Sequence, residues 1–163
     1  MTDEILRLVV YSMDGDKEAY GSLYEYYAKD MYRFALSICK NADNAQDAVQ
    51  DAALSVFRSM HLLHDPTKFK TYLFTALSNA CKKTFCENTQ ELPETLSDES
   101  FTFILGDVKR ALDLLDGESR EIVLLSVIGG FKSGEIAKIM NLSSPTVRTK
   151  KKRALSKMRK ELE

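Results

Sequence analysis

The stretch that decides the fold of this chain is FKSGEIAKIMNLSSPTVRTKKKRALSKMRK, residues 131–160. Between Lys132 and Lys160 it carries ten lysines and arginines against one acid, Glu135, a local charge of +9 in a chain whose total charge is −1. Lysine and arginine bind nucleic-acid phosphates with release of condensed counterions. This local excess of positive charge therefore predicts a polyanionic partner.

The same stretch has the pattern of two short helices joined by a tight turn. Residues 135–140 are amphipathic, with Ser133 as the expected N-cap and Asn141 suited to the left-handed conformation that ends a helix. Ser143-Ser144-Pro145 then predicts a second helix, because a capping hydroxyl precedes a proline fit for the first turn.

The second helix is expected to be apolar on one side and basic on the other. At about 100° per residue the apolar stripe contains Val147, Ala154, Leu155 and Met158. The other side contains Arg148, Thr149, Lys152, Arg153 and Ser156. This pattern is typical of a helix-turn-helix whose second helix enters a major groove. An ordinary bundle helix with a solvated cationic face is the alternative interpretation.

Composition places the chain among ordinary globular proteins. It has 163 residues, 44% hydrophobic and 29% charged. No run approaches about 20 apolar residues, and the acidic N-terminus MTDEILRLVV lacks a signal-peptide core. Three cysteines, an odd number, suit a reducing compartment. We therefore expect a soluble, cytoplasmic protein.

The pattern of residues indicates no metal site, no cofactor and no enzyme. His61 and His64 are three residues apart and Cys81 and Cys86 five apart, and neither pair has a zinc-knuckle spacing. Cys39 lies in an apolar helical stripe and is expected to be a small buried side chain. We find no nucleophile–base arrangement and no phosphate-binding glycine loop. The expectation is a binding protein.

Helical periodicity runs through nearly the whole chain, and glycine and proline are sparse, so the predicted class is all-α. The predicted organisation is a helical bundle over residues 1–86, an acidic linker over 87–106 and a helix-turn-helix domain over 107–163. Residues 87–121 carry a net charge of −7. Twenty linker residues reach about 66 Å when extended at ~3.3 Å each, but only about 25 Å as a relaxed coil.

Both predicted domains resemble those of a known family. The first is similar to region 2 of sigma-70 factors through AYGSLYEYYAKDMYRFAL, DNAQDAVQDAALSVF and FKTYLFTALSN, and the second to region 4 through LDGESREIVLLSVIGGFKSGEIAKIMNLSSPTVRTKKKRAL. The chain as a whole resembles a small sigma factor of the extracytoplasmic-function group. The resemblance implies a protein that binds core RNA polymerase and recognises two promoter elements, called −10 and −35. It also implies an anti-sigma factor as partner.

The resemblance assigns polymerase binding to Asp47, Gln50 and Asp51. Asp47 and Asp51 are four residues apart, so they share a helix face with Gln50 and can pair with a basic partner helix. On residue types alone, a solvated helix face is the simpler interpretation.

The resemblance places −10 recognition in the loop 61–68 and the helix that follows. Single-stranded bases are held by stacking and by cations along the backbone. The candidates are His64, Lys68, Lys70, Tyr72, Asn79, Lys82 and Lys83. Phe69 is expected in the core, and Tyr72 fits either role. The family usually has tryptophan at Tyr72 and arginines at Thr75 and Ser78, so this helix face is poorer in cations than is usual.

The resemblance places −35 recognition at the start of the second basic helix. The candidates are Ser144, Thr146, Arg148, Thr149, Lys150, Lys152 and Arg153. Arg148 and Lys152 suit guanine O6 and N7, whereas Lys150 suits a phosphate. The amides near Ser144 and Thr146 are expected to hold another phosphate.

Two other functions fit parts of the sequence. A stand-alone helix-turn-helix regulator would bind a palindromic duplex without polymerase. A degenerate sigma-like module would bind polymerase or an anti-sigma factor without directing initiation, in keeping with the few cations on the helix that begins at Phe69.

Overall fold

The computed structural model describes residues 1–87 and 108–163, with side chains described for residues 1–84 and 108–163. All regular elements within these residues are helices, which confirms the predicted all-α class. The chain divides into two compact units, Met1–Gln90 and Glu91–Glu163. The predicted linker lies outside the described residues apart from Glu87, where a helix ends.

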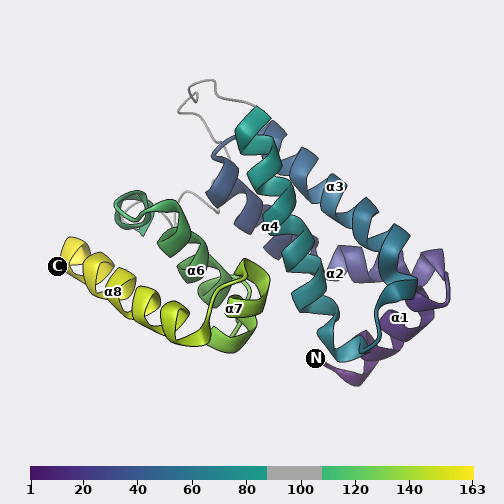
Figure 1. Cartoon of the computed structure of the whole chain (residues 1–163). Helices are drawn as coiled ribbons and strands as arrows, with labels where there is room; N and C mark the ends of the chain where they lie inside the picture. Colours follow the sequence, from purple (N-terminus) through teal and green to yellow (C-terminus); the bar gives the residue numbers. More distant parts are fainter. Residues whose placement is uncertain (88–107) are drawn as a thin grey trace. The chain divides into compact units, whose positions relative to one another are not determined.

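The first unit is a four-helix bundle with two short turns of 3₁₀ helix (Figure 1). Its elements are α1 (Asp3–Met13), α2 (Lys17–Cys39), α3 (Ala42–Ser59), η1 (Met60–Leu62), η2 (Pro66–Lys68) and α4 (Phe69–Glu87). Side chains cap three of the helix starts: Thr2, Asp16 and Asn41 accept hydrogen bonds from amides in the first turns of α1, α2 and α3. These caps satisfy amides that a helix leaves without an internal partner, and so define where each helix begins.

The core of the first unit lies where α3 packs on both α2 and α4. Phe34, Phe69 and Phe74 are fully buried there, and the rings of Phe34 and Phe74 meet edge to face with centroids 5.9 Å apart. The predicted core position of Phe69 is confirmed. Cys39 and Cys81 are also buried, and the hydrogen bond between their thiols lowers the pKa of Cys39.

The second unit contains the predicted helix-turn-helix. Its described elements are a helical segment over residues 108–113, α6 (Gly117–Val127), α7 (Ser133–Met140) and α8 (Ser144–Leu162). Asn141 ends α7 with a φ of 56°, as predicted, and Ser143 caps α8. Ile122, Leu125, Ile136 and Val147 are fully buried between the three labelled helices.

Two details of the predicted second unit are wrong. Ser133 is the first residue of α7 and not its cap; Lys132 holds the cap position, and its amide donates to the Glu135 carboxylate at 2.9 Å. Leu155 is 42% exposed, because only Val147, Ala154 and Met158 of α8 lie against the helices next to α8.

Across the described ranges 1–87 and 108–163, the helices are too short or too polar to cross a lipid bilayer.

Candidate functional site

The first candidate surface is the solvent face of α8. Burial of Val147, Ala154 and Met158 fixes the rotation of this helix about its own axis. The opposite side then presents four of the predicted −35 residues as exposed side chains, namely Arg148, Thr149, Lys152 and Arg153. The structure thus brings these four together on a cationic face that a nucleic-acid groove can meet.

The other three residues of the −35 set have more restricted surroundings. Ser144, Thr146 and Lys150 are half-buried. The Thr146 amide donates to the Ser143 hydroxyl at 3.3 Å, so a phosphate at this helix start would compete with the cap for that amide. Ser144 is the first residue of α8.

Lys150 is engaged within its own unit. Its Nζ lies 2.8 Å from Glu118 Oε1 at the start of α6, with the two side chains 36% and 41% exposed. This ion pair raises the pKa of Lys150. The lysine predicted to bind a phosphate is therefore already paired with a carboxylate. Helical periodicity gives no sign of this pairing, because Glu118 lies 32 positions earlier in the sequence.

Two further cations of the second unit bind backbone carbonyls. Lys157 Nζ donates to the Leu114 carbonyl at 2.8 Å. The Arg120 guanidinium donates to the carbonyls of Leu112 and Leu115, at 3.1 and 3.2 Å. These bonds tie α6 and α8 to the segment before α6, where the Leu112 carbonyl also accepts from the Leu115 amide at 3.0 Å. Of these two cations only Lys157 belongs to the basic stretch, and it is exposed.

The second candidate surface lies on α3. Asp47, Gln50 and Asp51 are all exposed and follow one another at helical spacing, as predicted. The opposite side of α3 is buried through a row of small residues, Ala45, Ala48, Val49, Ala52, Ala53 and Val56. Because α3 packs on α2 and α4, its outward carboxylates are held on a rigid support.

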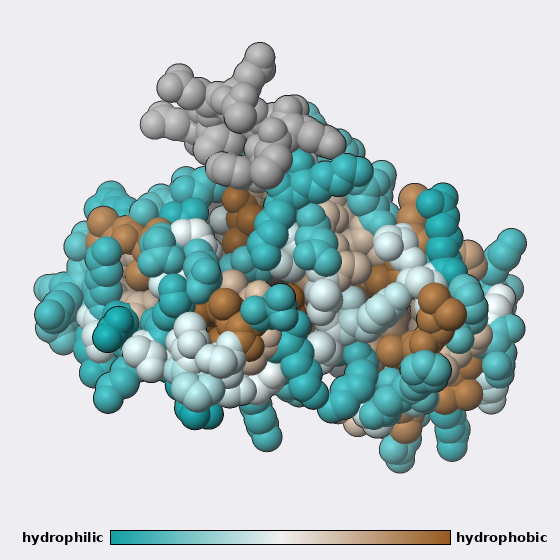
Figure 2. Space-filling model, viewed as in Figure 1, coloured by the Kyte–Doolittle hydropathy of each residue, from teal (hydrophilic) through white to brown (hydrophobic). Residues whose placement is uncertain are grey.

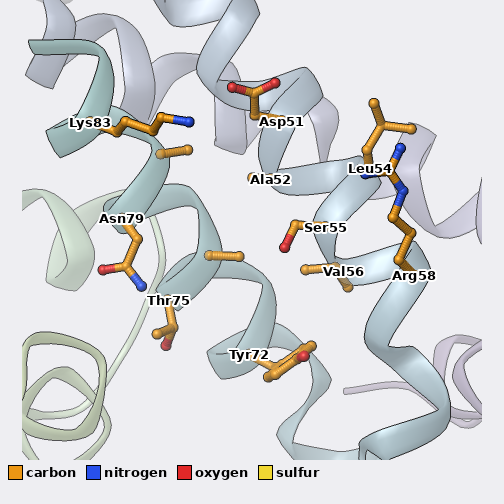
Figure 3. Close-up of a pocket in the computed structure, with 12 residues that line it drawn as sticks. Asp51, Ala52, Leu54, Ser55, Val56, Arg58, Tyr72, Thr75, Asn79 and Lys83 are labelled. Atoms are coloured by element: carbon orange, nitrogen blue, oxygen red, sulfur yellow. The ribbon is translucent and has the colours of Figure 1, made fainter. Parts of the chain in front are cut away.

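A groove of about 630 Å³ separates the walls formed by α3 and α4 (Figure 3). Three of the predicted −10 residues line it from α4: Tyr72, Asn79 and Lys83. The α3 wall includes Asp51, predicted to bind polymerase, together with Ser55. Small apolar side chains complete the lining, among them Ala52, Val56, Ala76 and Ala80. The groove therefore combines an apolar floor with hydroxyl, amide and ammonium groups along its rim.

A hydrogen-bonded relay holds Tyr72 at one end of this groove. The Ser59 hydroxyl donates to the Ser55 carbonyl at 2.8 Å, and the Tyr72 hydroxyl lies 2.5 Å from Ser59 Oγ. Either hydroxyl can be the donor in the second bond. This link joins α4 to the last turn of α3 and fixes the orientation of the ring. Tyr72, which fitted either a core or a binding role, is half-buried in the groove wall.

The remaining −10 candidates are not among the residues that line the groove. His64 and Lys68 are exposed on the connection between α3 and α4. Asp65 orders this connection by accepting from the Thr67 hydroxyl at 2.6 Å and the Thr67 amide at 3.0 Å, and these bonds lower the pKa of Asp65. On α4, Lys82 is exposed and Lys70 half-buried.

Sequence reasoning missed several residues at these surfaces. On α3, Leu54 and Arg58 line the groove and are exposed, and both continue the face of Asp47 and Asp51 at helical spacing, a signal that was present in the sequence. Ser59 and Glu118 act through partners distant in sequence and had no such signal. Over the residues with described side chains, no group of three or more potential metal ligands comes together.

Comparison with known proteins adds two family matches and several relatives. Residues 23–89 match the family model Sigma-70 region 2, and residues 105–158 match Sigma-70, region 4. The RNA polymerase sigma factor SigV of Bacillus subtilis is 28% identical over 145 residues, covering 83% of this chain and 86% of its own. The ECF RNA polymerase sigma factor SigX of the same organism is 25% identical, covering 90% and 85%.

Solved structures show the same fold. CnrH, solved in complex with the cytosolic domain of CnrY, superposes with a TM-score of 0.78 at 24% identity, covering 98% of this chain and 97% of its own. The sigma factor RpoE, solved with the anti-sigma factor NepR from Bartonella quintana, gives 0.70 at 23% identity, covering 86% and 96%.

The two region matches follow one another along the chain and together span most of it. The geometry agrees with them, since the region 4 match contains the cationic helix α8 and the region 2 match contains the acidic face and the groove. The chain belongs to the sigma-70 family of RNA polymerase sigma factors, as a member of its extracytoplasmic-function group.

Proposed function

We propose that this sigma factor directs promoter-specific initiation by holding two DNA elements at once while it is bound to core RNA polymerase. The observation that supports this most directly is the pairing of the two regions in one chain, each with an exposed surface of the required chemistry. The protein acts by recognition alone, and bond formation belongs to the polymerase. It works in the cytoplasm, where its polymerase and promoter partners are.

In the second unit, α8 reads the −35 element from the major groove. Arg148 and Lys152 are four residues apart, about 6 Å along the helix axis and so about two base-pair steps of ~3.4 Å. Both are exposed on the same face and can reach guanine O6 and N7 of nearby base pairs, which discriminates by about 1–3 kcal/mol for a bidentate contact. Thr149 and Arg153 lie beside them and position the helix on the phosphates.

In the first unit, the groove and the connection before α4 hold the −10 element as a single strand. Tyr72 offers a ring fixed by Ser59 for base stacking, and Asn79 offers an amide for a base edge. Lys83, His64 and Lys68 surround them as partners for the backbone. Thr75, which lines the groove, is uncharged and Ser78 is buried, so phosphate contact along α4 is weak and opening of the promoter depends strongly on the polymerase.

The polymerase docks on the exposed face of α3 through Asp47, Gln50 and Asp51. Two carboxylates one turn apart attract a basic helix and fix its register. An anti-sigma factor is the expected regulator, as in the solved complex of RpoE with NepR. The acidic linker over residues 87–106 joins the two DNA contacts into one bivalent unit.

Promoter selection by reconstituted holoenzyme tests the assignment of the −10 element to the first unit and of the −35 element to the second. Arg148→Ala should relax selection at the −35 element only, and Asn79→Ala at the −10 element only. Lys160→Ala and Lys29→Ala are matched controls, because each removes one exposed side chain of the same unit outside the proposed contacts. Loss of selection at both elements from either variant, or at neither, contradicts the proposed assignment.

A further inference from the structure

Two cysteine thiols meet in the core of the first unit. Cys39 is the last residue of α2 and Cys81 lies in the second half of α4, and these two helices pack on each other. The side chains are 6% and 0% exposed, and their thiols are hydrogen-bonded to each other. Two sulfurs from separate helices in direct contact form a pair that oxidation can join covalently.

Burial alone does not require sulfur at these two positions. Alanine and valine fill the buried side of α3, which packs on the same two helices. A thiol behaves as a side chain of similar small bulk but adds reactivity. The two cysteines are 42 positions apart, so their contact comes from the packing of α2 on α4.

The two thiols are unequal, which gives each a separate part in an oxidation. The hydrogen bond from Cys81 lowers the pKa of Cys39, although burial acts in the opposite direction. The thiolate is the form that attacks an oxidant. Cys39, which also keeps slight exposure, is therefore the sulfur that reacts first, and Cys81 is the one that closes the bond.

Burial restricts the oxidant to a small molecule. Figure 2 shows a mostly hydrophilic outer surface, with apolar side chains in small separate groups on the face in view, and the two sulfurs lie beneath the surface of the first unit. Hydrogen peroxide can reach them during a brief local opening, whereas the disulfide of another protein cannot.

The chemistry with peroxide is balanced within the pair. The Cys39 thiolate attacks one peroxide oxygen, which breaks the O–O bond, releases hydroxide and leaves a sulfenic acid on Cys39. The Cys81 sulfur then attacks the Cys39 sulfur, and the sulfenic oxygen leaves as water. Two thiols and one peroxide thereby give one disulfide and two waters.

We propose that Cys39 and Cys81 form a reversible disulfide when the chain meets peroxide, and that this bond stabilises the first unit while leaving the groove between α3 and α4 usable. In a reducing compartment such a bond persists only while the oxidant is present. It stabilises because it closes a long loop, which contains the whole of α3 and so restricts the unfolded chain.

The groove is spared because the cysteine lies on another side of α4. Asn79 and Lys83 line the groove, and each is two residues from Cys81, about 200° around the helix. Both are exposed, whereas Cys81 is fully buried. The cross-link therefore lies outside the surfaces assigned above to DNA and polymerase, and the inference does not depend on the proposed function.

Peroxide treatment of the full-length Cys86→Ser chain tests the cross-link, because this variant removes the third cysteine. Peptide mapping without reductant should link the peptides of Cys39 and Cys81, and neither thiol should then react with iodoacetamide. The midpoint of thermal unfolding should rise by about 10 °C on oxidation and return after dithiothreitol. Cys81→Ala in the same background is the matched control, and peroxide should not raise its midpoint.

Promoter binding tests the second half of the proposal. The oxidised Cys86→Ser chain, reconstituted with core RNA polymerase, should bind a promoter duplex as tightly as the reduced chain does. Loss of binding by the oxidised form alone would overturn the claim that the groove stays usable, whereas no binding by either form would refute the proposed function and leave the cross-link standing. Two thiols that remain free after peroxide, or that are oxidised to sulfinic acid without a link, would overturn the proposal.

Discussion

Replacing Glu118 by glutamine should make Lys150 accessible to DNA. In the folded chain Lys150 Nζ is 2.8 Å from the Glu118 carboxylate, whereas Lys152, two residues on, is exposed on α8. The two lysines lie in the same basic run, yet the charge of Lys150 is balanced by a carboxylate of its own unit. They should therefore contribute unequally to the salt dependence of DNA binding.

The expected size follows from counterion release. Each neutralised phosphate contributes about −0.9 to the slope of log K against log of salt concentration, which corresponds to a factor of about 3.5 in affinity over a fourfold change in salt. Lys152→Ala should make the slope shallower by about 0.9, and Lys150→Ala should change it little. Glu118→Gln should steepen the slope by up to about 0.9, and adding Lys150→Ala to Glu118→Gln should remove that gain.

The assay is binding of reconstituted holoenzyme to a labelled promoter duplex, followed by fluorescence anisotropy at several salt concentrations. The two single lysine variants serve as each other's controls, because both remove one ammonium group from α8. An equal decrease of slope in Lys150→Ala and Lys152→Ala, with no change in Glu118→Gln, would show that phosphate displaces Glu118 and that the ion pair does not withhold Lys150 from DNA.

Three further predictions concern stability and are checked by urea unfolding. Burial raises the pKa of Tyr20 from its ordinary 10.0 to about 12, and its hydroxyl donates to the Ala53 carbonyl. The protonated hydroxyl is thus favoured in the folded state, so this contribution is present below about pH 10 and lost as pH rises towards about 12; Tyr20→Phe should reduce that alkaline loss. Gly129→Ala should destabilise the chain by about 1–3 kcal/mol, because a Cβ there would lie 2.5 Å from the ring of Phe131. Gly117→Ala is the control and should not destabilise the chain, because a Cβ there would meet nothing within 4 Å. Asp116→Ala removes the N-cap of α6 and should cost about 1 kcal/mol; no change would show that the cap is dispensable.

The helical elements could be predicted because their signals are local. Apolar spacing identified the buried side of α8 through Val147, Ala154 and Met158. The same spacing included Leu155, because a stripe drawn on one helix does not tell how far its neighbours extend over it. The N-cap of α7 was predicted at Ser133 but lies at Lys132, although Glu135, three residues after Lys132, carried the capping signal.

The sites were only partly predictable, for a different reason. The exposed charges of α3 and α8 follow from helical spacing and were identified correctly as surface residues. Pairings across the fold, such as Ser59 with Tyr72 or Glu118 with Lys150, depend on how two helices pack and leave no pattern in either segment. The groove between α3 and α4 belongs to the same class, since its walls come from separate helices.

The most direct test of the proposed function is a titration of the fluorescently labelled chain with core RNA polymerase, followed by promoter selection from a random library. We expect tight binding to core polymerase and recovery of promoters with two elements, at −10 and −35, only when the polymerase is present. Binding to a palindromic duplex by the chain alone, with no affinity for core polymerase, would show that the proposed function is wrong.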